Sequence, residues 1–495
     1  MPVSPERERF RELAAAGYRY IPLYSELLND AETPVTLFVK LTKGTGRFLL
    51  ESVEQGYQRS RYSFIGWHPL LTLKATGSLL TVSEKEGSFQ INGEPLAEIY
   101  QQLSALRVAP LPELDPFFGG AVGYIGYDYV RQIYQLPPPT GPVLGMPDLY
   151  WVVPEYLVRF DHIAHRITII LLARVDTNDF DGAYEQARRK LTRIIDRFDR
   201  KIRPVPLPNT LKGEKPATRT TLLARHQFVD LVERAKEHIQ AGEVKQVVLS
   251  QRISQKYSGD PFLFYRVLRS LNPSPYLFYL DFDGFKLAGS SPETMVRLTD
   301  GLVTLKPIAG TRPRGATAAE DRRLRQELLA DEKEQAEHQI LVDLGQQELN
   351  RVCQAGSIRA TERMAVESYS HVMHLVTTLQ GELLPSLSGY DLLRAVFPAG
   401  TLSGAPKKRA LEIIETLEPL RREFYGGCVG YLGFNGNLDT CITIRTVLFH
   451  GRKAHLQVGA GIVAASDPEK EYEETLNKAA ALLTALEQAG AGGWS

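Results

Sequence analysis

The stretch LQVGAGIVAASDPEKEYEETLNKAAAL (Leu456–Leu482) decides the assignment of the fold, because it joins a β-strand to an α-helix at a sharp boundary. Apart from Gln457, its first nine residues are apolar or small, and they include two valines and an isoleucine, which predicts a strand over 456–464. Ser466 and Glu469 have the spacing of a capping box, and Pro468 is suited to an early helical position. We therefore expect an α-helix that begins where the strand ends.

The same stretch has polar features that point to a ligand. Glu471, Glu474 and Lys478 have the i, i+3, i+7 spacing that places side chains on one face of a helix. Gly459 and Gly461 allow the strand backbone to approach another group closely. This arrangement predicts a site for an anion and a hard cation. The alternative is a sheet strand followed by a solvated helix face.

Composition restricts the class of protein. The chain has 495 residues, of which 43% are hydrophobic, and its 58 basic residues equal its 58 acidic ones, so no net field favours nucleic acid or an anionic membrane. Cys353, Cys428 and Cys441 are widely spaced, which argues against a disulfide framework and favours a reducing compartment. The longest aliphatic run, Ile167–Ala173, is too short to span a bilayer, and the N-terminus lacks a signal core. We expect a cytoplasmic protein.

The chain divides into a region 1–200, a proline-rich linker 201–221 and a region 222–490. Strands are expected at many consecutive positions, including the continuous segments Leu302–Gly310 and Thr440–Phe449. Hairpin-like succession of strands favours an α+β fold. We predict large antiparallel or mixed sheets in a two-layer sandwich with helices on the outside, not a doubly wound nucleotide fold.

A second acidic pair, Glu334 and Glu337, lies three residues apart in the predicted helix of DEKEQAEHQILVDL. Mg²⁺ prefers a few carboxylate oxygens together with water and substrate oxygens. We expect Glu337 and Glu474 to bind Mg²⁺ directly, with Glu334 and Glu471 holding its waters. Zinc is disfavoured because no Cys or His spacing supports it. The alternative for this segment is an ordinary surface helix.

Four further residues are candidates for binding or catalysis. His374, in an apolar strand, either is a core histidine or serves as an acid near neutral pH. Thr401 precedes a helix whose first turn can favour an anion or hydroxyl, although a plain capped helix fits equally well. Arg445 needs an anionic partner if it points inward, and Tyr425 could donate to the same carboxylate. A strand-edge arginine in water is the alternative.

Long motifs in this chain resemble the chorismate-utilising enzymes, and most closely the family of anthranilate synthase component I. The similarity covers nearly the whole chain. The matching stretches are LLES, GGAVGYIGYDYVR, KQVVLSQR, NPSPYLFYL, GSSPE, PIAGTRPRG, AEHQILVDL, PAGTLSGAPK and VGAGIVAASDPEKEYEETLNKA.

Two positions indicate the subclass within that family. Isochorismate-forming relatives carry a lysine that activates water where this chain has Gln246. Aminodeoxychorismate synthases carry a lysine nucleophile where this chain has Ala309. The resemblance therefore implies ammonia as the nucleophile and amination ortho to the ring carboxylate.

The resemblance also implies roles for individual residues. It assigns catalysis to Glu293, His374 and Thr401. It assigns chorismate binding to Gly310, Thr311, Tyr425, Arg445, Gly459, Ala460, Gly461 and Lys478. It assigns Mg²⁺ binding to Glu334, Glu337, Glu471 and Glu474. The resemblance implies that region 1–200 is regulatory and senses tryptophan, and that region 222–490 binds chorismate and carries out catalysis. It assigns binding of the inhibitor tryptophan to Ser52, Pro275, Tyr276 and Leu277.

The implied activity is Mg²⁺-dependent amination of chorismate at C2 and elimination of pyruvate to give anthranilate, the first step of tryptophan biosynthesis. No Cys-centred glutaminase segment is present in the sequence, so we expect a separate glutamine amidotransferase subunit, component II, in a heterotetramer. The segment GQQELNRV departs from the family pattern at Gln346, Gln347, Glu348 and Asn350. Alternatives are release of aminodeoxyisochorismate, formation of isochorismate or salicylate, and a tryptophan-binding paralogue without turnover.

Overall fold

The computed structural model describes residues 2–52, 61–114, 116–138, 141–175, 179–202, 219–368 and 372–490. Most of the predicted linker, residues 203–218, lies outside them. None of the helices in these ranges combines the length and apolar character needed to cross a bilayer.

Two long strands hold the architecture together. β3 (Tyr62–Thr76) and β7 (Leu149–Asp161) pair antiparallel along their length, with a register shift between Pro69 and Leu71. A bulge of this kind bends the strands. One end of the pair therefore belongs to one sheet and the other end to a second sheet.

The first sheet contains the glycine-containing strand predicted from the sequence. Its order, read from the strand pairings, is β1 (Tyr20–Leu28), β8 (Arg166–Arg174), β7, β3, β2 (Arg47–Glu51), β11 (Tyr276–Phe282), β12 (Phe285–Ser291), β21 (Thr446–His450), β22 (Lys453–Ile462) and β10 (Gln246–Lys256). Two short strands also pair with β10, namely β9 (Arg219–Thr221) and β18 (Gly404–Ala405).

The second sheet starts at the exposed N-terminal hairpin. Its order is β5 (Gly87–Asn92), β4 (Leu79–Glu84), β3, β7, β6 (Gly120–Ile125), β19 (Cys428–Gly433), β20 (Leu438–Ile442), β13 (Thr294–Thr299), β14 (Leu302–Leu305) and β17 (Val372–Glu382), and β17 also pairs with β15 (Ile308–Pro313) and β16 (Arg359–Ser368). Every pairing between these strands is antiparallel. The predicted α+β sandwich of antiparallel sheets is confirmed.

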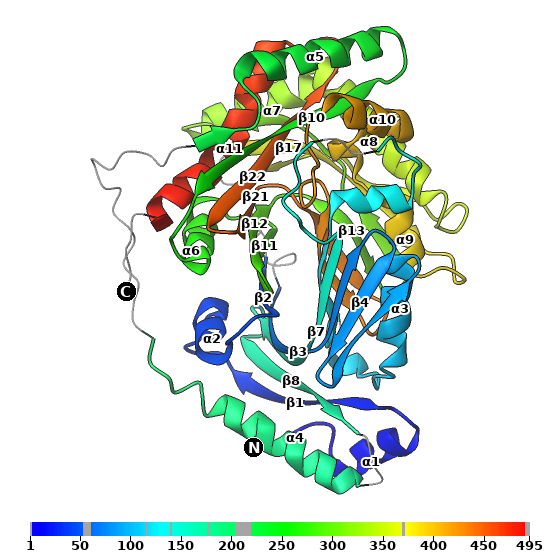
Figure 1. The fold of residues 1–495 in the computed structure, drawn as a ribbon, viewed down its shortest axis with the longest axis vertical. Helices are drawn as coiled ribbons and strands as arrows, with labels where there is room; N and C mark the ends of the chain where they lie inside the picture. The colour runs from blue at the N-terminus through cyan, green and yellow to red at the C-terminus, as the bar shows by residue number, and fades with distance from the viewer. Residues whose placement is uncertain are drawn as a thin grey trace.

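Helices cover the outer faces of both sheets (Figure 1). The main apolar core joins residues of both sheets and of helices that cover the second sheet, and these residues come from both halves of the chain. The first sheet is covered by α1 (Arg7–Ala15), α2 (Pro34–Leu41), α4 (Phe180–Ile195), α5 (Arg225–Gln240), α6 (Pro261–Leu271), α10 (Lys407–Leu417) and α11 (Pro468–Gly490). The second sheet contacts α3 (Pro95–Ala105), α7 (Ala318–Ala330), α8 (Glu332–Leu349) and α9 (Gly389–Val396). Single 3₁₀ turns are η1 (Pro112–Leu114), η2 (Tyr127–Gln132) and η3 (Gly400–Leu402).

The structure corrects three local predictions. Thr440–Phe449 is not one strand: β20 ends at Ile442, β21 begins at Thr446, and Arg445 between them has a φ of 50°. The segment Leu302–Gly310 is likewise divided between β14 and β15. β20 and β21 pair with different strands, so the chain must turn between them. β14 and β15 instead pair with the same strand, β17, in one continuous register, with Leu305 opposite Leu379 and Ile308 opposite Val376. The interruption falls at Lys306 and Pro307, because proline cannot donate a hydrogen bond to a neighbouring strand.

The third correction concerns the start of α11. The carboxylate of Asp467 accepts hydrogen bonds from the amides of Glu469 and Lys470, both 3.1 Å long. The Ser466 hydroxyl instead accepts from the amide of Val463, at 3.1 Å. Asp467 therefore caps the helix, because its carboxylate stands directly before the first helical residue, Pro468.

Candidate active site

One wall of the site is the glycine-containing strand β22. A Cβ atom on Gly459 would lie 2.6 Å from the Leu249 carbonyl and 2.7 Å from the Tyr425 hydroxyl. A Cβ atom on Gly461 would lie 2.8 Å from Nε2 of Gln246. Side chains at these positions would displace the tyrosine and the glutamine, so the structure explains the two glycines. Oε1 of Gln246 is buried and has no hydrogen-bond partner among the described residues, which leaves an acceptor for a ligand.

Helix α11 turns its polar face toward this strand. The ammonium group of Lys478 donates to the carbonyl oxygen of Gly459 at 2.9 Å and forms an ion pair with Glu474 at 2.6 Å. The shared face predicted for Glu474 and Lys478 is therefore confirmed. Ala460, between the two glycines, buries its methyl group in the core formed with α5 and α10, so only its backbone is available to a ligand.

Carboxylates from two distant helices lie within electrostatic range of one another. Burial raises the pKa of Glu337 on α8, and the negative charges of Glu334 and Glu474 raise it further. Burial also raises the pKa of Glu471 on α11, with Glu474 adding to the shift. The pair on α8, Glu334 and Glu337, is separated from the pair on α11, Glu471 and Glu474, by more than 130 residues in the sequence. Folding brings the two pairs together as like charges, which favours a cation among them.

Cationic side chains already compensate these acids. Lys333 lies 3.6 Å from Glu337, and Nη1 of Arg312 donates to Glu334 at 3.0 Å. Among the described residues, no group of three or more His, Cys, Asp and Glu side chains has the geometry of a formed metal site. The donor set nevertheless consists of carboxylate oxygens without sulfur or imidazole, which suits Mg²⁺. Mg²⁺ binding stays a prediction.

Glu293, between β12 and β13, is the buried acid of the site. The Thr401 hydroxyl on η3 donates to its Oε1 at 2.8 Å. Burial raises the pKa of Glu293 to about 8, while the Thr401 hydrogen bond and the positive charge of Lys478 oppose the shift. Near neutral pH its carboxyl group is protonated and can donate a proton.

His374 on β17 faces the same region. Its Nδ1 lies 2.9 Å from the carbonyl oxygen of Gly310, and Thr311 is its partner in the β15–β17 register. Burial lowers the pKa of His374, the Gly310 hydrogen bond opposes that shift, and the positive charges of Arg445 and Lys478 add to it. The ring is therefore neutral near pH 7, with Nδ1–H donating to the carbonyl and Nε2 able to accept a proton. This favours a base over the predicted acid.

Arg445 occupies the break between β20 and β21. Its left-handed backbone conformation is uncommon for a residue other than glycine and costs on the order of 1 kcal/mol. Burial lowers the pKa of its guanidinium, and the nearby Tyr425 side chain and the negative charge of Glu474 oppose that shift. A half-buried cation beside a tyrosine hydroxyl is suited to bind a carboxylate.

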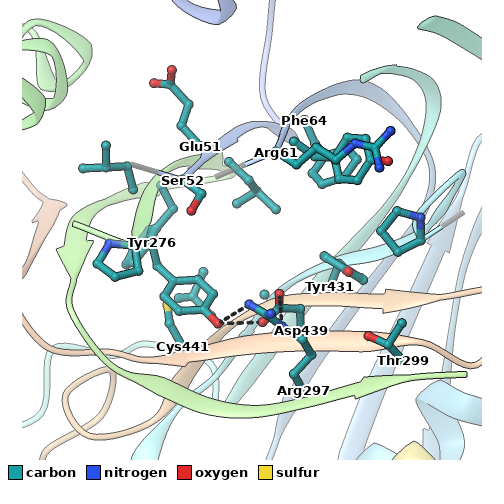
Figure 2. Close-up of a pocket in the computed structure, with 18 residues that line it drawn as sticks. Glu51, Ser52, Arg61, Phe64, Tyr276, Arg297, Thr299, Tyr431, Asp439 and Cys441 are labelled. Atoms are coloured by element: carbon teal, nitrogen blue, oxygen red, sulfur yellow. Dashed lines mark hydrogen bonds and ion pairs between the residues drawn. The ribbon is translucent and has the colours of Figure 1, made fainter. Parts of the chain in front are cut away.

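A separate cavity of about 260 Å³ lies between the two sheets. All four residues predicted to bind tryptophan, Ser52, Pro275, Tyr276 and Leu277, line it. Figure 2 shows the Tyr276 hydroxyl and the Arg297 guanidinium turned toward Asp439, at 2.8 Å and 2.9 Å from its carboxylate oxygens.

Sequence reasoning missed most of the wall of this cavity. The missed residues include Arg61, Tyr62, Phe64, Arg297, Tyr431 and Asp439. A charged residue in an apolar strand, such as Arg297 in TMVRLT, was the available signal. It does not reveal the partner, because Asp439 is supplied by another strand of the second sheet.

Comparison with known proteins agrees with this geometry. A family model described as chorismate binding enzyme matches residues 45–484. Anthranilate synthase component 1 of Acetivibrio thermocellus is 44% identical, over 97% of this chain and 98% of the relative. The crystal structure of anthranilate synthase component I from Streptococcus pneumoniae has a TM-score of 0.74 and 34% identity, over 92% of this chain and 99% of that one. The menaquinone-specific isochorismate synthase MenF of Escherichia coli, at 21% identity and a TM-score of 0.71 over 97% and 98% of the two chains, shares the fold.

Proposed function

Since the chain belongs to the chorismate-binding enzyme family, we propose that it aminates chorismate at C2 with ammonia and eliminates pyruvate to give anthranilate. The observation that carries this proposal is the convergence of the buried acid Glu293, the cation Arg445 and four carboxylates from two helices on the glycine-containing strand. These groups match a substrate that has two carboxylates and a leaving hydroxyl.

We place the enolpyruvyl carboxylate of chorismate against Arg445, Tyr425 and the backbone of Gly459 and Gly461. When bound by Glu337 and Glu474, with Glu334 and Glu471 holding its waters, Mg²⁺ supplies positive charge for the ring carboxylate. The charges of the two chorismate carboxylates are then balanced, and the ring is oriented, before any bond changes.

The proton transfers follow from the protonation states of two residues. Glu293, held by Thr401, donates its proton to the C4 hydroxyl as ammonia adds at C2 and water leaves, and the new C2 ammonium group then returns a proton to the Glu293 carboxylate. In the second step the neutral His374 accepts the C2 proton as the C3–O bond to the enolpyruvyl group breaks. The departing enolpyruvate takes up that proton on its methylene carbon, so the products are pyruvate and anthranilate.

Two positions support ammonia as the nucleophile. The side-chain carbonyl of Gln246 can accept a hydrogen bond from ammonia but cannot remove a proton from water as a lysine amine can. Ala309 has no nucleophilic group that could form a covalent intermediate.

Product analysis tests the proposal. Incubation with chorismate, ammonium and Mg²⁺ is expected to yield a fluorescent product with the mass of anthranilate. A product that retains the enolpyruvyl group would indicate release of aminodeoxyisochorismate, and a product without nitrogen would indicate isochorismate or salicylate. Tryptophan binding by folded protein that consumes no chorismate would contradict the proposal and support a regulatory paralogue.

We propose that ammonia comes from a separate glutamine amidotransferase, component II, in a heterotetramer. Glutamine should then support turnover only when that subunit is added, whereas ammonium salts should support it without the subunit. Turnover of glutamine by the purified chain would contradict this assignment.

We propose that the cavity between the sheets binds tryptophan as an inhibitor. It offers aromatic walls for an indole ring and both guanidinium and carboxylate groups for the ends of an amino acid. Ser52→Phe should fill the cavity and raise the tryptophan concentration needed for half-inhibition at least about tenfold, which corresponds to about 1.4 kcal/mol of lost binding.

Isothermal titration with tryptophan, together with inhibition curves, measures the effect of Ser52→Phe. Ser88→Phe is the matched control, because it adds the same ring at an exposed position of the hairpin strand β5. Unchanged inhibition in Ser52→Phe would show that tryptophan binds elsewhere.

A further inference from the structure

A buried ion pair joins the elements that form the walls of the active site. Arg422 and Glu418, in the segment between α10 and β19, have side chains that are 1% and 2% exposed. Nε and Nη2 of Arg422 donate to the two carboxylate oxygens of Glu418, at 2.8 Å and 2.7 Å. Burying two charges is costly unless their remaining donors and acceptors are satisfied. In this pair those groups bond to the backbone of other elements.

The pair holds two separate segments of backbone. Arg422 donates through Nη1 to the carbonyl of Leu402, at 2.6 Å, and through Nη2 to the carbonyl of Val248, at 2.7 Å. Oε1 of Glu418 accepts from the amide and the hydroxyl of Ser250, at 2.7 Å and 2.9 Å. Strand β10 and turn η3 are therefore bound to one guanidinium–carboxylate unit.

Each anchored residue is next to a proposed substrate-binding or catalytic residue. Val248 and Ser250 are the register partners of Gly461 and Gly459 on β22. Leu402 directly follows Thr401, which holds Glu293. A shift of the ion pair would thus move the glycine strand relative to the Thr401 turn.

The same guanidinium also supports the tyrosine of the site. It lies 5.7 Å from the ring centroid of Tyr425 and 4.7 Å from that of Tyr127. The amide of Tyr425 donates to the carbonyl of Arg422 at 3.0 Å. Lysine could supply the charge at this position, but it lacks the planar set of donors that reaches three acceptors at once.

We propose that Arg422 and Glu418 are positioning residues, which set the spacing between the Thr401 turn, Tyr425 and the glycine strand without touching the substrate. This inference rests on the proposed binding of chorismate at that site. A displacement of about 1 Å in such a wall can reduce catalysis about 100-fold.

Steady-state kinetics of Arg422→Lys with chorismate and ammonium tests the inference. We expect KM to rise and kcat to fall, with a combined loss of about 100-fold in kcat/KM, while tryptophan affinity at the separate cavity stays unchanged. Partial unfolding would lower apparent kcat but leave KM unchanged, so a reduced kcat with wild-type KM would overturn the positioning role.

Two further variants keep the test decisive. Arg159→Lys is the matched control, because Arg159 is also a buried arginine but lies on β7 and donates to the Leu114 carbonyl, at 2.7 Å. Its kinetic constants should not change. If Arg422→Lys does not fold, the isosteric Glu418→Gln should raise KM, and an unchanged KM there would overturn the inference. Wild-type protein that makes no anthranilate would instead refute the proposed function.

Discussion

Glu474→Ala is expected to reduce chorismate turnover at saturating Mg²⁺ by at least about 1,000-fold. Burial is the main cause of the raised pKa of both Glu337 and Glu471, and the negative charge of Glu474 adds to both shifts, so Glu474 lies near both acids. Its loss removes one proposed Mg²⁺ ligand and leaves Lys478 without its ion-pair partner beside the glycine strand. The measurement is the initial rate of anthranilate formation across a Mg²⁺ titration.

Glu473→Ala is the matched control for Glu474→Ala. Glu473 is the preceding residue of α11, its side chain is 62% exposed, and it pairs with Arg225 on α5 instead of facing the site. Its activity and Mg²⁺ dependence should match those of the wild type. Because half of the Glu474 side chain is also exposed, both variants should change the free energy of unfolding by no more than about 0.5 kcal/mol. Full activity of Glu474→Ala would exclude this residue from metal binding.

Glu293→Gln is expected to lower kcat by about 1,000-fold, because the amide keeps the shape of the acid but cannot donate a proton to the leaving hydroxyl. The pKa of Glu293, about 8, determines the direction in which kcat changes with pH. The donor must be protonated, so wild-type kcat should fall as pH rises above 8. The residual activity of Glu293→Gln should lack this decline.

The raised pKa of Glu293 also predicts that the stability of the protein depends on pH. Folding raises the pKa of Glu293 above its ordinary value of 4.5, so the folded protein binds this proton more tightly than the unfolded chain does. The stabilising contribution is full below pH 4.5 and is lost as pH rises toward 8, which thermal unfolding of the wild type and Glu293→Gln can compare.

Glu155→Gln is the control for both measurements on Glu293. Glu155 is another buried carboxylate, which pairs with Lys190 at 2.6 Å on the outer face of the first sheet. Its kcat should keep the wild-type pH dependence. Wild-type kcat that stays constant through pH 9 would contradict the assignment of Glu293 as the proton donor.

Local patterns in the sequence determined most of the elements of this protein. The strand predicted over 456–464 overlaps the observed β22 (Lys453–Ile462), and α11 starts at Pro468, where an early helical position was predicted. The spacing of Glu471, Glu474 and Lys478 also predicted their shared helix face. These features depend on interactions within one or two turns or along one strand, where periodicity and the preference of proline for the first helical turn are sufficient to predict them.

Only the tertiary structure decided which of these local features face one another. Asp467, and not Ser466, caps α11, because the two side chains compete for nearby amides and the surrounding packing selects between them. Arg445 lies in a turn, and not in a strand, because the chain there passes from β20, which pairs with β13, to β21, which pairs with β12.

The active site and the cavity depend on contacts across the whole chain. The meeting of α8 with α11, the hydrogen bonds from the Arg422–Glu418 pair to β10 and η3, and the cavity between the sheets all join segments through contacts that no local pattern encodes. The sequence alone determined the residue types and their order. The packing of two sheets around shared strands decided their distances, burial and charge environment, because these depend on neighbours that are remote along the chain.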